Sequence, residues 1–158
     1  MRLSKNFHIK EFLKSNVATR KNISNEPTKE GMRQMQILCQ NLLQPIREGL
    51  GPLRINSGWR SEELNKALGG AHKIIKGKYV ATSQHCKGQA ADLKFVCDGV
   101  VDNKQIWDFV LDSGLEFDQM INEFDWTWIH ISFNLDKNRN QLLEAYRGDS
   151  GRTKYKKV

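Results

Sequence analysis

Long apolar runs, paired cysteines and a signal sequence are all missing from this 158-residue chain. No apolar run approaches the roughly 20 residues of a membrane-spanning helix, so we expect no membrane span. The three cysteines form no CxxC pair and leave one over, which argues against a disulfide framework and favours a reducing compartment. Residues 1–7 contain no apolar h-region, so we expect synthesis in the cytoplasm without a signal peptide.

Acidic residues are also in the minority, with 18 Asp and Glu against 25 Lys and Arg and a net charge of +7. Residues 137–158 hold seven basic and two acidic side chains, so this short segment carries a net charge of +5 out of the total of +7. The body of the chain is nearly balanced, which does not favour nucleic-acid binding as its function. A basic tail can contact nucleic acid or an anionic bacterial wall, or can simply be solvated. We expect one domain over residues 1–146 and a mobile basic tail over residues 147–158.

Helical patterns dominate the first half of the chain, and strand patterns dominate the second. Residues 7–15 form a short amphipathic pattern, and Pro27 and Thr28 are typical of a helix start. The helix that follows has a core-facing apolar stripe, and Pro45 inside it predicts a kink or an early end. Expected strands cover residues 52–56, 90–96, 119–123 and 128–133, and residues 141–146 form a last strand or a helical turn. The predicted class is α+β, with N-terminal helices packed on a small antiparallel sheet.

A histidine and an aspartate stand close together between residues 83 and 95. His85 and Asp92 are separated by small residues, and Asp92 opens an apolar run that is typical of a buried strand. A structural protein has little reason to place a carboxylate there. Imidazole nitrogen and carboxylate oxygen are both zinc ligands, so the pattern indicates a metal site that lacks its third ligand.

The alternation in residues 128–133 places His130 on the face opposite the apolar side chains, toward a cleft or solvent. If residues 124–127 form a tight hairpin loop, Glu123 lies opposite Trp128 and shares a face with His130. A carboxylate beside a metal ligand can take a proton from water as a general base. Asp125 is the competing base, but it lies in the predicted turn, where Asp is common for conformational reasons. We prefer Glu123.

Arg60 lies between an expected strand and Ser61, which is a good helix N-cap. An Arg at such a junction can reach into a cleft and bind a carboxylate or a developing oxyanion. On its own this signal is weak, because most loop arginines have no such role.

These residues stand in three spaced motifs that closely resemble the M15 zinc peptidases. The motifs are residues 55–65 (INSGWRSEELN), Ser83-x-His85-x-x-Gly88-x-Ala90-x-Asp92, and Trp128-x-His130. The nearest branch is the small, often phage- or prophage-encoded one, which is similar in fold to the zinc-bearing signalling domain of hedgehog proteins. The resemblance covers about residues 4–135.

The resemblance implies one zinc ion, with His85, Asp92 and His130 as its ligands. It implies that Ser83 helps to hold the substrate and that Arg60 binds the substrate or stabilises the transition state. Glu123 matches the acidic position upstream of the last ligand. Many relatives also have an acidic residue three positions before that histidine, where this chain has Thr127.

The implied function is hydrolysis of peptide bonds in peptidoglycan stem peptides. The enzyme would be a D-Ala-D-Ala carboxypeptidase or an endopeptidase of the L-Ala-D-Glu type, and spacing alone does not choose between them. We expect a monomer that acts on the bacterial cell wall once it is released, like a phage endolysin. The alternative is a non-catalytic zinc-stabilised module of the same fold that binds the cell wall or a protein.

Overall fold

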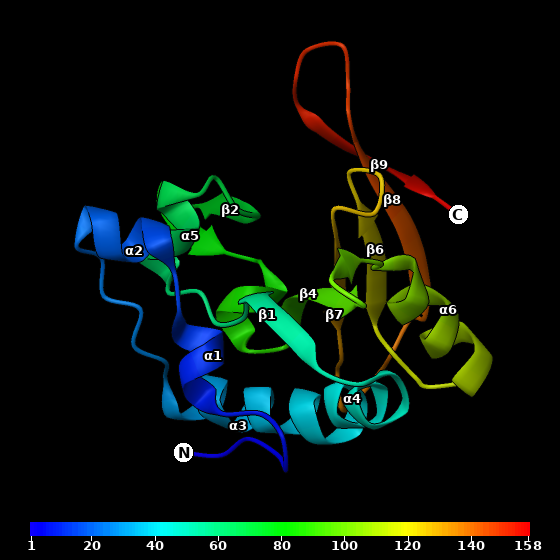
Figure 1. The fold of residues 1–158 in the computed structure, drawn as a ribbon. Coiled ribbons are helices and arrows are strands. Elements are labelled where there is room, and N and C mark those ends of the chain that lie inside the picture. Colours follow the sequence, from blue (N-terminus) through cyan, green and yellow to red (C-terminus); the bar gives the residue numbers. More distant parts are fainter.

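A computed structural model describes all residues from 1 to 158 and places most helices ahead of the strands in the chain (Figure 1). The helices are α1 (Ile9–Leu13), α2 (Asn16–Lys21), α3 (Lys29–Leu38), the π-helical η1 (Cys39–Leu43), α4 (Gln44–Leu50), α5 (Glu62–Ala67), the 3₁₀ turn η2 (Gln84–Lys87) and α6 (Lys104–Ser113). The strands are β1 (Leu53–Ser57), β2 (His72–Ile75), β3 (Lys78–Ala81), β4 (Ala90–Cys97), β5 (Val100–Val101), β6 (Gln119–Glu123), β7 (Trp128–Ser132), β8 (Gln141–Arg147) and β9 (Thr153–Lys157).

One seven-stranded sheet organises the molecule. Its strands run in the order β1-β4-β7-β6-β8-β9, and β5 pairs with β4. Neighbouring strands are antiparallel except β6 and β8, which are parallel. The hairpin β2–β3 forms a separate two-stranded sheet. The fold is therefore a mixed one with a mostly antiparallel sheet, as the sequence predicted.

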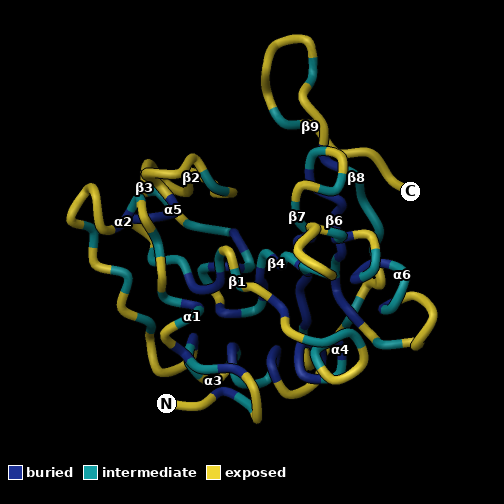
Figure 2. The backbone as a smooth tube through the Cα atoms, in the orientation of Figure 1, coloured by how far each residue is buried: buried dark blue, intermediate teal, exposed yellow.

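The two faces of the sheet have different surroundings. One face carries apolar side chains of β4, β6 and β7 that join the helices in a cluster of 23 buried residues. In Figure 1, α3 and α4 run beneath this part of the sheet, and Figure 2 shows the buried segments gathered there. The other face carries Asp92, His130 and Glu123, because side chains alternate along a strand. Asp92 and His130 lie between apolar residues, and Glu123 is two residues from Ile121, which pairs with His130. The fold thus presents a polar sheet face above a conventional core.

The helical stretch from α3 to α4 contains the expected apolar stripe, with Met35, Leu38, Leu42 and Ile46 completely buried. Pro45 does not end the helix, contrary to one expectation. The helix widens instead into the π turn η1, where the backbone N–H of Gln44 donates to the carbonyl of Cys39, and then continues as α4. Proline has no N–H and disturbs the preceding turn, so the irregularity lies one turn before it.

Three segments differ from the sequence-based expectation. Residues 16–21, for which the sequence predicted no helix, form α2, which Ser15 caps at the N-terminus and Asn22 ends with φ of 52°. Residues 100–101, for which the sequence predicted no strand, form the short strand β5. The segment 147–158, expected as a mobile tail, contains β9, which pairs with β8 over five residues. The sheet therefore extends nearly to the end of the chain.

No helix combines the length and the apolar character needed to cross a membrane.

Candidate metal centre and active site

His85 lies on the short turn η2, which Ser83 begins. The Ser83 hydroxyl accepts a hydrogen bond from the backbone N–H of His85 (3.3 Å), so this side chain holds the turn in place. The Nδ1 atom of His85 lies 2.7 Å from the carbonyl oxygen of Gly58. Because a carbonyl only accepts, Nδ1 carries the hydrogen, and the neutral form of the ring then has its lone pair on Nε2. Such a bond orients the ring of a metal-binding histidine.

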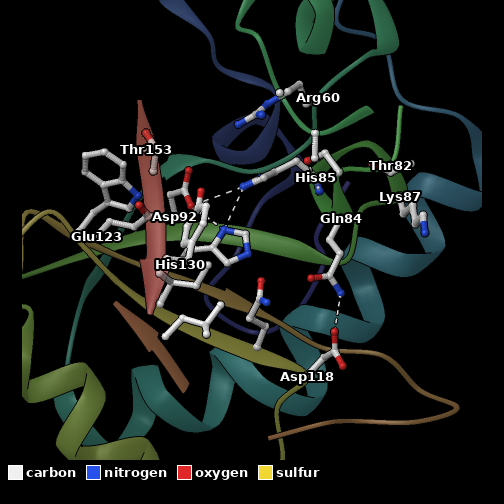
Figure 3. Close-up of a pocket in the computed structure, with 18 of the residues that line it drawn as sticks. Arg60, Thr82, Gln84, His85, Lys87, Asp92, Asp118, Glu123, His130 and Thr153 are labelled. Atoms are coloured by element: carbon white, nitrogen blue, oxygen red, sulfur yellow. Dashed lines mark hydrogen bonds and ion pairs between the residues drawn. The ribbon is translucent and has the colours of Figure 1, made fainter. Parts of the chain in front are cut away.

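Asp92 and His130 are directly opposed residues on the antiparallel strands β4 and β7. The Nδ1 atom of His130 lies 3.0 Å from Oδ1 of Asp92 and 3.3 Å from Nε2 of His85. The Nε2 atom of His85 lies 3.4 Å from the same oxygen of Asp92. Figure 3 shows the three side chains converging on one point.

The spacing of these three ligand atoms fits zinc. Zinc bonds of about 2.0–2.2 Å in a tetrahedral arrangement place ligand atoms about 3.3–3.6 Å from one another. The separations of 3.3 and 3.4 Å fall within that range, and the third, 3.0 Å, is slightly shorter. Two imidazoles and one carboxylate also leave a fourth position open, which is typical of catalytic rather than structural zinc sites.

The Asp92 carboxylate is ionised in this arrangement. Burial acts to raise its pKa, but the imidazoles of His85 and His130 outweigh burial and hold the pKa of Asp92 well below its usual range. A charged oxygen of Asp92 is therefore available as a ligand for a metal ion.

Glu123 stands at the end of β6, where the predicted hairpin register places it. Glu123 pairs with Trp128, and Ile121 pairs with His130, as the loop length predicted. The Glu123 side chain is buried, and burial raises the pKa of Glu123 to about 7, with His130 opposing the rise and Asp92 adding to it. A carboxylate with such a pKa is suited to accept and release a proton near neutral pH. Asp125 is exposed in the turn and does not line the cavity at the metal ligands.

The turn after Glu123 has an unusual backbone. Phe124, Asp125 and Trp126 have φ values of 49°, 57° and 63°, so three consecutive residues other than glycine are left-handed. Each costs about 1 kcal/mol or more relative to a right-handed conformation. Two buried side chains hold the turn. The side-chain oxygen of Asn122 accepts a hydrogen bond from the backbone N–H of Trp126 (2.6 Å), and the side-chain amide of Asn103 donates to the backbone carbonyl of Trp126 (2.9 Å). The strained turn therefore fixes the end of the strand that carries Glu123.

Arg60 lies beside His85 on the rim of the site (Figure 3). Its backbone N–H donates to the carbonyl of His85 (3.2 Å), and its Nη1 donates to the side-chain oxygen of Asn65 (3.3 Å). The Nε atom of Arg60 is buried and has no hydrogen-bond partner. Arg60 thus keeps donor capacity for a ligand, as its predicted role requires.

Sequence reasoning missed an ion-pair network that supports η2. Asp118 accepts two side-chain hydrogen bonds from Arg139 (2.8 and 2.7 Å) and one from Gln84 (2.7 Å), the residue before His85. Hydrogen bonds from Arg139 hold the pKa of Asp118 below its usual range. No local pattern could have signalled this network, because its three members are single polar residues far apart in the sequence.

The candidate ligands His85, Asp92 and His130, called the metal-ligating cluster below, line a cavity of about 970 Å³. Ser83, Arg60 and Glu123 line the same cavity. A second cavity of about 320 Å³ shares Arg60, Leu68 and Asp92 with the first. The larger one has a basic part formed by Lys87, Lys137 and Arg139, and an aromatic part formed by Phe124, Trp128 and Tyr155. The predicted site residues are therefore brought together in one cleft, except Asp125.

A family model described as peptidase M15 matches residues 5–132, which is most of the chain and includes every residue of the cluster. The chain belongs to the peptidase M15 family. M15 peptidases are zinc-dependent, and the His85, Asp92 and His130 atoms of this M15 peptidase are spaced to bind such an ion. No curated protein and no solved structure matches the chain.

Proposed function

We propose that this M15 peptidase hydrolyses peptide bonds in peptidoglycan stem peptides, with one zinc ion held by His85, Asp92 and His130. The observation that carries the proposal is Glu123, a buried carboxylate with a pKa raised to about 7 in the same cavity as three spaced ligand atoms. The proposed architecture is the one shared by D-Ala-D-Ala peptidases and the hedgehog signalling domain.

In this proposal each protein group has one task. Bound zinc supplies a Lewis acid that polarises the scissile carbonyl and lowers the pKa of a coordinated water. Glu123 accepts the proton of the attacking water and delivers it to the leaving amine. Arg60 donates hydrogen bonds to the negative charge that develops on the carbonyl oxygen, or to a carboxylate of the substrate. Ser83 holds the turn that carries His85, and its side chain is a polar contact for the bound peptide.

The shape of the cleft favours an endopeptidase over a carboxypeptidase. Arg60, Leu68 and Asp92 line both cavities, and we propose that a bound peptide extends from one cavity to the other past the metal-ligating cluster. A carboxypeptidase needs a closed end that holds the terminal carboxylate. The basic side chains Lys87 and Lys137 suit the free carboxylates of stem peptides. We therefore propose cleavage of an internal bond, such as one of the L-Ala-D-Glu type.

The rival function is a zinc-stabilised binding module without catalysis. Glu123 argues against a binding module, because such a module does not need a buried carboxylate with a raised pKa beside the metal ligands. We further propose that the protein acts as a monomer on the bacterial wall after release from the cell, in the manner of a phage endolysin.

The test is digestion of purified peptidoglycan by the zinc-loaded protein, with mass spectrometry of the released muropeptides. We expect new peptide fragments, loss of activity with a chelator, and recovery when zinc is added back. Products that lack only the terminal D-Ala would replace the endopeptidase assignment by the carboxypeptidase one. Unchanged muropeptides after long incubation would favour the binding module.

A further inference from the structure

The C-terminal strand β9 borders the cavity at the metal-ligating cluster. Thr153 and Tyr155 of β9 line this cavity together with Leu143 of β8. Figure 3 shows Thr153 on the same side of the site as Glu123. The match to the M15 family model ends at residue 132, so this wall is built by a part of the chain that the family model does not cover.

The strand register places Tyr155 on the face that carries Glu123. Glu123 pairs with Ala145 across β6 and β8, and Ala145 pairs with Tyr155 across β8 and β9. Directly opposed residues project from the same face of a sheet. Two strand spacings separate the Cα atoms of Glu123 and Tyr155 by about 10 Å, and the residue between them has only a methyl side chain. A tyrosine side chain is long enough to cover much of that gap.

The Tyr155 hydroxyl is a free hydrogen-bond donor. Burial raises the pKa of Tyr155, and the negative charges of Glu123 and Asp92 raise it further, so the phenol keeps its proton. No hydrogen bond within the protein contributes to that shift. The ring is only half-exposed although it lies on the outermost strand of the sheet.

We infer that Tyr155 is a substrate-positioning residue, whose hydroxyl donates a hydrogen bond to the bound peptide on the Glu123 side of the metal-ligating cluster. Arg60 lines the same cavity from the loop between β1 and α5. A peptide bound in this cavity meets a donor from each of these two segments, so that its scissile bond is held in register with Glu123. Peptide carbonyls and carboxylates, which accept such bonds, are the groups that both donors recognise. This inference rests on the proposed peptidase function.

The substitution Tyr155→Phe tests the hydroxyl alone, because the ring stays in place. The matched control is Tyr146→Phe: Tyr146 lies on β8 of the same hairpin, pairs with Lys154 and therefore projects from the opposite face of the sheet. We expect Tyr155→Phe to lower kcat/KM for a soluble stem peptide about fivefold, the effect of losing one hydrogen bond to substrate. Its Tm and zinc content should equal those of the wild type, and Tyr146→Phe should keep full activity.

Two outcomes separate failure of this inference from failure of the proposed function. If the wild type cleaves stem peptides and Tyr155→Phe has the same kcat/KM, Tyr155 has no positioning role and the peptidase proposal stands. If the wild type cleaves no stem peptide, calorimetry tests the role of Tyr155 instead. It compares the affinity of the same peptide for zinc-loaded wild type and for zinc-loaded Tyr155→Phe. About fivefold weaker binding by the variant supports the role, whereas equal affinity, or no binding by either protein, overturns it.

Discussion

Glu123 combines two properties that rarely occur together in one carboxylate. It is 7% exposed, and it shares a cavity with Asp92, a second carboxylate whose charge resists its ionisation. The ionised form of Glu123 is nevertheless populated at neutral pH, because His130 partly offsets the cost of burying the charge. A group balanced in this way changes its protonation easily, which is the requirement for a general base.

The substitution Glu123→Gln preserves the shape of this side chain and removes its basicity. We expect zinc content to remain at one ion per chain, because Glu123 is not among the three ligating residues. Peptide hydrolysis should fall by about 10²- to 10⁴-fold, the usual contribution of a general base. Metal analysis and a turnover assay measure the two effects, and Asp125→Asn is the matched control. Full activity in Glu123→Gln would assign the proton transfer to another group.

The ion pair of Asp118 and Arg139 makes stability depend on pH. The folded-state pKa of Asp118 lies below its unfolded value, so its contribution is present above about pH 4 and is lost as pH falls through the folded pKa. We expect Asp118→Asn to lower the free energy of unfolding by about 1–2 kcal/mol at pH 7, since Arg139 is half-exposed and water weakens the pair.

Urea unfolding of wild type and Asp118→Asn at several pH values measures this effect. The difference between the two proteins should shrink below about pH 4, where the wild-type carboxylate takes up a proton. Asp149→Asn, in an exposed loop, serves as the control and should change little. A difference that stays constant down to pH 2 would contradict the role of the ion pair.

At the scale of elements, local patterns predicted well the strands that carry Glu123 and His130. The hairpin of β6 and β7 has the predicted register and, except that β7 ends one residue early at Ser132, the predicted bounds. Two alternating apolar runs joined by four residues leave few other pairings. That register alone placed Glu123 and His130 on one face. The sequence also singled out His85 and Asp92, which the structure brings together with His130, since small residues and a strand-opening carboxylate mark the stretch around them.

Elements without an apolar pattern could not be predicted. The helix α2 has one buried residue, Ala18, and its caps at Ser15 and Asn22 define it rather than a hydrophobic stripe. β9 is rich in lysine and nearly all exposed, so its sequence is typical of a solvated tail. Its position follows from long-range pairing, which begins with the parallel contact of β8 with β6. Such pairing depends on the whole sheet and leaves no local signal.

Deletion of residues 148–158 removes β9 and should leave the fold intact. No residue of the main hydrophobic cluster lies beyond Phe133, so the core does not depend on this strand. We expect the shortened protein to bind zinc and to unfold cooperatively, with a Tm lower by a few degrees. Its kcat/KM for stem peptides should fall at least as far as in Tyr155→Phe. Circular dichroism, metal analysis and kinetics measure these quantities, and a shortened chain without a folded core would contradict this view of the sheet.

For the whole molecule, the metal-ligating cluster ties together segments that are distant in sequence. His85 comes from η2, Asp92 from β4 and His130 from β7, so an ion bound there stabilises the folded state over the unfolded chain. At free zinc 100-fold above Kd, stability should rise by about 2.7 kcal/mol, which corresponds to a Tm increase of roughly 5–10 °C.

Thermal unfolding with and without zinc measures this effect. His130→Ala removes one ligand, so its Tm should respond little to zinc at the same concentration. The same rise in both proteins would mean that zinc acts elsewhere.

The place of β9 in the molecule has a practical consequence for purification. The backbone N–H of Val158, the last residue, donates to the carbonyl of Leu142 (3.2 Å), so the chain ends on the strand pair that borders the cavity. An affinity tag fused there would continue directly from that wall and compete with long substrates for the opening. The N-terminus lies beside α3 on the other side of the molecule (Figure 1). A tag on Met1 should leave the cleft free, and assays of tagged protein should use that end.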